Sequence, residues 1–89
     1  MKTARVTITN KRGLHARAAA KLVQLTHQFD STITVRKDQE EADAKSMLDL
    51  LMLSGGKDSV LTVSANGQDE EVALEEVQRL ISGKFGEEE

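Results

Sequence analysis

Apolar residues recur along the chain at two different spacings, and the spacing switches several times. Alternation of apolar and polar residues predicts strands with one buried face, and recurrence every three or four residues predicts helices with an apolar stripe. Strand-like segments cover residues 3–9, 32–37, 40–44 and 60–66. Helix-like segments cover residues 15–29, the residues from Ser46 up to Gly55, and residues 69–83. The predicted order of elements is therefore β-α-β-β-α-β-α.

Turn-forming residues separate these segments. Asp38-Gln39 predicts a hairpin, Asn66-Gly67 a tight turn, and Gly55-Gly56 the end of the second helix. Ser46, with Asp49 three residues later, fits a capping box at the start of that helix. The last residues, GKFGEEE, are acidic, and we expect a frayed tail with solvated glutamates in which only Phe85 is held down.

One small domain accounts for the whole pattern. The 89 residues contain no internal repeat and no linker, so a single domain over residues 1–89 is expected. Four short strands can form one sheet, and three helices can cover one of its faces. The predicted fold class is α+β, a two-layer sandwich, and we expect a monomer.

The composition of the chain limits the classes of binding partner and the cellular compartment that we expect. The net charge is −3 and the only aromatic residues are Phe29 and Phe85, which argues against nucleic-acid binding through a basic face or stacked rings. The chain has no cysteine, no segment that looks like a signal peptide and no apolar run near the ~20 residues that span a bilayer. We expect a cytoplasmic protein that does not insert into membranes.

The segment NKRGLHARAAAKL places His15 where the first helix begins, and three interpretations compete. His15 could be a turn residue without chemistry. A metal site shared with His27 is weak, because the two lie twelve residues apart along one helix and no cysteine joins them. The third interpretation uses the free amides of a helix N-terminus, which bind anions, so a nucleophilic imidazole there could carry an anion covalently. Arg17 would offer a guanidinium fork to phosphoryl oxygens.

Two motifs carry a resemblance to a known family. GLHARAAAKL closely resembles the active-centre segment of HPr, the phosphocarrier of the bacterial phosphotransferase system, and DAKSMLDLLMLSGGK resembles the second signature of that family. The resemblance extends over essentially the whole chain, to SANGQDEEVALEEV along the last helix. It implies an open-faced β-sandwich, in which three helices cover one face of a four-stranded antiparallel sheet.

The resemblance also implies a function and its residues. His15 would accept a phosphoryl group on Nδ1 from enzyme I, which obtains it from phosphoenolpyruvate, and pass it to a IIA protein or domain. Arg17 would stabilise the phosphoryl group, and Ala16 would contribute a backbone amide. Ser46 matches the serine that HPr kinase/phosphorylase modifies in many members. The chain would be a carrier and not an enzyme, with its His15 ring at the surface and no cofactor or metal.

Three departures from the family pattern affect which protein we expect to receive the phosphoryl group from His15. Ala18 stands where the usual motif has proline, and Gln24 and His27 stand at two places where sugar-transport members often carry lysine. LLMLSGGK looks more like the nitrogen-related branch, called NPr, than the sugar branch. The resemblance therefore implies a role in sugar uptake or in nitrogen-related regulation.

The second helix is too rich in large apolar residues for all of them to be buried. We expect an exposed apolar patch for partner docking beside His15, made of Met47, Leu48, Leu51 and Met52 with Ala20 of the first helix. An alternative function follows from this patch: a regulatory interaction module that binds partners there and is switched by phosphorylation of Ser46.

Overall fold

The computed structural model describes the chain from Met1 to Glu89 and has the predicted order of elements. The strands are β1 (Lys2–Thr7), β2 (Thr32–Lys37), β3 (Glu40–Asp43) and β4 (Val60–Asn66). The helices are α1 (Ala16–Thr26), α2 (Met47–Met52) and α3 (Glu70–Ser82), and a 3-10 turn over Lys84–Gly86 follows α3. None of these helices has the length and apolar character needed to cross a lipid bilayer.

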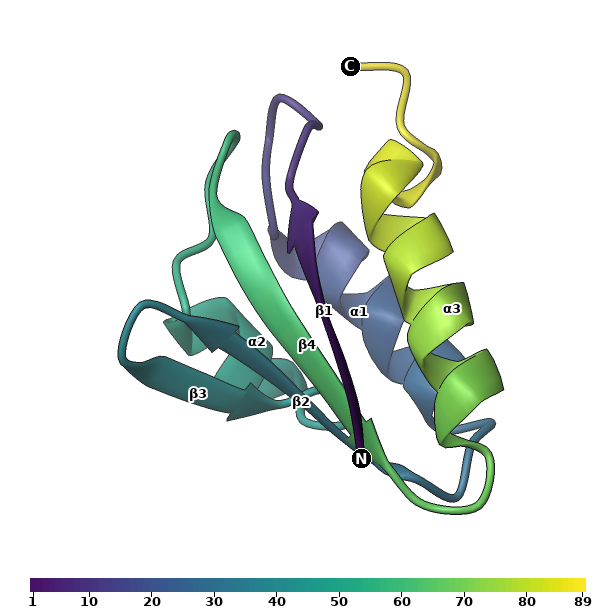
Figure 1. Cartoon of the computed structure of the whole chain (residues 1–89). Coiled ribbons are helices and arrows are strands. Elements are labelled where there is room, and N and C mark those ends of the chain that lie inside the picture. The colour runs from purple at the N-terminus through teal and green to yellow at the C-terminus, as the bar shows by residue number, and fades with distance from the viewer.

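The strands form one antiparallel sheet in the order β1-β4-β2-β3. All three helices lie on the same side of it, as Figure 1 shows, and the other face is open. The hairpin between β2 and β3 has the predicted two-residue turn, because Lys37 pairs with Glu40 and Asp38 takes a positive φ of 56°. The predicted α+β open-faced sandwich is therefore confirmed.

The core lies between the sheet and the helices. Ile33, Val35, Leu61 and Val63 are fully buried, whereas the residues that alternate with them face the open side. The helices contribute Ala18, Ala19 and Leu22 from α1, Leu50 from α2, and Ala73, Val77 and Ile81 from α3. The two adjacent alanines of α1 are completely covered, so their small side chains let that helix pack closely against its neighbours.

Two helices end earlier than their sequence pattern suggests. The first ends at Thr26 and not near residue 29, and the Thr26 hydroxyl donates to the carbonyl of Ala44 over 2.9 Å in the interior. The second ends at Met52, after which Ser54 takes a positive φ of 54°. Gly55 is therefore not the residue that stops α2; it is buried against the side chain of Ile8.

The expectation of a frayed acidic tail is wrong, although the expectation that Phe85 is held down is confirmed. Phe85 is fully buried, and burial of such a ring stabilises the folded chain by about 1.5–3 kcal/mol. The Lys21 Nζ donates to the carbonyl of Phe85 over 2.7 Å, and the Lys11 amide donates to the backbone oxygen of Glu89 over 2.6 Å. The tail therefore folds back over the start of α1.

Candidate functional site

His15 is the residue that precedes the first turn of α1, as the sequence predicts. Its backbone is extended (φ −85°, ψ −178°), and its carbonyl accepts the amide of Ala19 over 2.8 Å. Its side chain makes no capping hydrogen bond to the helix. The imidazole is therefore free of the helix and available for other contacts.

The loop before His15 is held by backbone contacts with the loop after α2. The Leu14 amide donates to the carbonyl of Gly55 over 2.7 Å, and Gly13 has a φ of +67°. A β-carbon on Gly13 would lie 2.5 Å from the oxygen of Gly55, a distance that real structures do not allow. Position 13 therefore requires glycine for two reasons: its backbone is left-handed, and the neighbouring loop leaves no room for a β-carbon.

The tail supplies a residue of the site that the sequence did not reveal. The Nε2 atom of His15 contacts the Oε2 atom of Glu87 in a short hydrogen bond, and Asn10 Nδ2 donates to Oε1 of the same carboxylate over 3.0 Å. The His15 and Glu87 side chains are only 18% and 16% exposed. The expectations of a surface ring and of solvated glutamates are therefore wrong for these two residues.

This contact changes the acidity of the carboxyl group. The hydrogen bond from His15, more than the one from Asn10, lowers the pKa of Glu87 against the opposing effect of burial. No local sequence signal could have placed Glu87 here, because it is 72 positions from His15 and lies in a segment without apolar periodicity. The Nδ1 atom of His15 has no hydrogen-bond partner in the chain.

Arg17 is exposed and forms no ion pair within the chain. It lines an open depression whose wall consists entirely of charged residues: Lys11, Arg12, Arg17, Glu87, Glu88 and Glu89. Arg17 makes no hydrogen bond to the His15 ring. Glu87 links the two residues, because it binds the ring and also lines the depression with Arg17. The Ala16 amide lies in the first turn of α1 and has no acceptor within the chain.

Ser46 caps α2, and its Oγ accepts the amide of Asp49 over 3.2 Å. Only this half of the predicted capping box forms. The Asp49 carboxylate accepts instead from the amide of Asp43 over 3.2 Å, because the Ser46 amide already donates to the Asp43 carbonyl. The cap and the preceding loop are thus tied together by Asp49.

The predicted apolar patch is present in part. Leu48 and Met52 are 69% and 68% exposed and Leu51 is 39% exposed, whereas Met47 packs against the core and Ala20 is half-buried. The other histidine, His27, follows the last turn of α1 and its Nε2 contacts the carbonyl of Lys45 at 3.2 Å.

Known proteins share both the sequence and this fold. A family model described as the PTS HPr component phosphorylation site matches residues 2–83. The chain is 46% identical to phosphocarrier protein NPr of Shewanella violacea over 92% of this chain and 90% of the relative. It is 43% identical to phosphocarrier protein HPr of Cupriavidus necator over 91% of each. A crystal structure of HPr from Thermoanaerobacter tengcongensis matches with a TM-score of 0.96 and 44% identity, and all of both chains is covered. The chain therefore belongs to the HPr family of phosphocarrier proteins of the phosphotransferase system.

Proposed function

We propose that this chain accepts a phosphoryl group on Nδ1 of His15 from phosphorylated enzyme I and transfers it to a IIA protein or domain. The observation that carries the proposal is the environment of the His15 ring. Its Nε2 atom binds Glu87, whereas its Nδ1 atom has no hydrogen-bond partner in the chain. The ring also lies at the N-terminus of α1, because His15 is the N-cap of that helix. The Nδ1 lone pair would form the bond to phosphorus while the bond to the donor breaks, and the donor keeps that electron pair.

Two groups are suited to hold the incoming phosphoryl oxygens. Arg17 has an unpaired guanidinium group on the exposed side of the first turn, and the Ala16 amide has no acceptor in the chain. A helix N-terminus and a guanidinium fork both favour phosphoryl anions. The enzyme partners would supply the catalysis, so the chain acts as a carrier.

Labelling with phosphoenolpyruvate and enzyme I tests this proposal. Wild-type protein should acquire acid-labile, alkali-stable phosphate, and His15→Ala should acquire none while its circular dichroism stays native. His27→Ala is the matched control, because it removes the only other histidine from an exposed position. Label that persists in His15→Ala would refute the assignment of His15.

Arg17→Ala gives a second test of the same site. Loss of a charge-assisted pair of about 1.5–3 kcal/mol should slow acceptance by roughly 10- to 100-fold without unfolding the chain. Arg36→Ala is the control, since Arg36 is an exposed arginine on the sheet that pairs with Glu41. Equal rates in the two variants would remove Arg17 from the site.

The exposed side chains of α2 support a docking role for the patch of Leu48, Leu51 and Met52. Leu48→Ser should raise the KM for enzyme I and for the IIA acceptor, and Val60→Ser, which changes an apolar residue that is 45% exposed on β4, should not. Chase experiments with IIA proteins of the sugar and nitrogen-related branches would identify the acceptor by its faster rate.

The patch also favours the second candidate, a regulatory module that binds partners through α2 and is modified at Ser46 by HPr kinase/phosphorylase. The two candidates differ in one measurement. A regulatory module would bind its partners equally well in His15→Ala and would need no phosphoryl transfer, whereas a carrier loses its activity in that variant.

A further inference from the structure

Three polar side chains form one connected row beside α1, two from the segment before that helix and one from the far end of the chain. Asn10 is fully buried and its Nδ2 atom donates twice, to the Gly13 carbonyl over 2.8 Å and to Glu87 Oε1 over 3.0 Å. The other carboxylate oxygen of Glu87 binds His15 Nε2. Both oxygens of the Glu87 carboxylate are therefore engaged, one by the ring and one by a buried amide.

The position of Glu87 does not depend on the ring. Phe85 is anchored in the core two residues earlier, and Lys21 binds its carbonyl. Two residues later, the backbone oxygen of Glu89 accepts the amide of Lys11. The carboxylate is thus fixed from both sides and from Asn10, so it can hold the ring and need not follow it.

A carboxylate with a lowered pKa stays ionised and can only accept hydrogen bonds, which decides where the ring proton lies. The proton must be on Nε2, and in the neutral ring the lone pair is then on Nδ1. We propose that Glu87 is a positioning residue that fixes the Nε2–H tautomer and the orientation of His15, so that Nδ1 faces the phosphoryl donor. This inference rests on the proposed function of His15. The family match ends at residue 83 and does not include Glu87.

The same contact would assist the transfer itself. When Nδ1 takes the phosphoryl group, the ring keeps its Nε2 proton and gains positive charge, and a carboxylate on that proton offsets the charge. Removal of a hydrogen-bond partner that orients a metal-binding histidine lowers affinity or activity by about 10- to 100-fold. We expect a loss of that size in the rate of acceptance, with an unchanged KM for enzyme I.

The test combines nitrogen NMR of the imidazole with acceptance kinetics, on the full chain in its unphosphorylated and phosphorylated forms. At alkaline pH the wild-type His15 ring should show only the Nε2–H tautomer, with an Nε2 proton protected from exchange with water. Glu87→Ala should lose that protection, show a population of the Nδ1–H tautomer and accept phosphate about 10- to 100-fold more slowly. Glu87→Gln removes the negative charge but keeps the side-chain volume, so the tail should stay packed in this variant. A rate loss that both variants share is therefore due to the lost carboxylate and not to a loosened tail.

Glu88→Ala is the matched control for the NMR measurement, because it removes a neighbouring glutamate that forms neither a hydrogen bond nor an ion pair with the ring. Its ring spectrum should equal that of the wild type. An unchanged ring spectrum in Glu87→Ala would overturn the proposal, and so would a changed spectrum with an unchanged rate. A further outcome is that wild-type protein shows the fixed tautomer and accepts no phosphoryl group. That result would refute the proposed function of His15 but not the proposal that Glu87 fixes the tautomer of its ring.

Discussion

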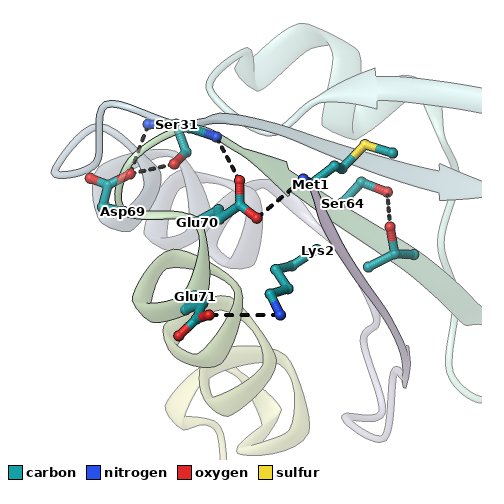
Figure 2. Close-up of polar contacts among 9 residues, drawn as sticks. Met1, Lys2, Ser31, Ser64, Asp69, Glu70 and Glu71 are labelled. Atoms are coloured by element: carbon teal, nitrogen blue, oxygen red, sulfur yellow. Dashed lines mark hydrogen bonds and ion pairs between the residues drawn. The ribbon is translucent and has the colours of Figure 1, made fainter.

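The carboxylate of Asp69 binds Ser31 and makes no hydrogen bond to the helix that Asp69 begins. It accepts the Ser31 amide over 2.9 Å, the Ser31 hydroxyl in a short contact, and the Asp30 amide over 2.9 Å. Figure 2 shows Asp69 and Ser31 where the turn before α3 meets the loop between α1 and β2. Asp69 therefore joins two segments that are 38 positions apart.

This cluster predicts a pH dependence of stability. The Ser31 hydroxyl, followed by the Asp30 amide, lowers the pKa of Asp69 from its ordinary value of 3.8. Between the lowered pKa of the folded chain and the ordinary value of the unfolded chain, the unfolded chain binds more protons. The stabilisation is therefore present above the ordinary value and is lost as the pH falls through the folded-state pKa. Urea unfolding at several acidic pH values should show a shallower loss of stability in Asp69→Asn. Glu40→Gln, which changes an exposed carboxylate that forms no ion pair, should keep the wild-type slope.

Gly13→Ala should damage both stability and function. Its β-carbon would lie 2.5 Å from the Gly55 oxygen, and alanine at a φ of +67° costs roughly 1–2 kcal/mol in itself. The loop that carries His15 must move, so phosphate acceptance should fall together with the free energy of unfolding. Gly56→Ala is the control, because nothing lies within 4 Å of a β-carbon there. Equal urea midpoints for the two variants would contradict the close approach of the loops.

Phe85→Ala should destabilise the chain by about 3–5 kcal/mol, since it empties a fully buried site. It should also release Glu87, so the protected Nε2 proton of His15 should disappear even though Glu87 is intact. Val72→Ala, in which the changed residue is 47% exposed on α3, should stay within about 0.5 kcal/mol of wild type by urea unfolding. A solvated tail would predict no difference between the two variants.

Local patterns in the sequence were sufficient for the two central strands, less accurate for β1, which ends at Thr7 and not at residue 9, and insufficient for the tail. The limits of β2 and β4 agree with the predicted 32–37 and 60–66, because alternation reports burial against the layer of helices above. The position of His15 before α1 also follows from its neighbours. Glu87 could not be found in this way, because its contacts depend on Phe85 entering a core that only the folded chain provides. The early end of α1 likewise reflects a bond between Thr26 and Ala44, which lie 18 positions apart.

The cap at Ser46 predicts that one substitution there lowers the stability of the chain and that another lowers only its rate of phosphoryl acceptance. Ser46→Ala should cost about 1 kcal/mol, because the Asp49 amide loses its acceptor. Ser46→Asp keeps an acceptor at a position that tolerates negative charge, so thermal melting should stay close to wild type. The added charge is at the N-terminus of α2, two residues before the exposed Leu48, and we expect it to lose water when a partner covers the exposed side chains of that helix.

Ser46→Asp should therefore slow phosphate acceptance from enzyme I by at least about fivefold. The neighbouring cation is not free to neutralise the added charge, because the Lys45 ammonium already donates to the Phe29 carbonyl over 2.8 Å. The measurement is the KM for enzyme I, which should rise while kcat changes little. Gln39→Asp adds the same charge in the exposed hairpin between β2 and β3 and is expected to leave the KM as it is. Wild-type kinetics in Ser46→Asp would restrict Ser46 to its role as a helix cap.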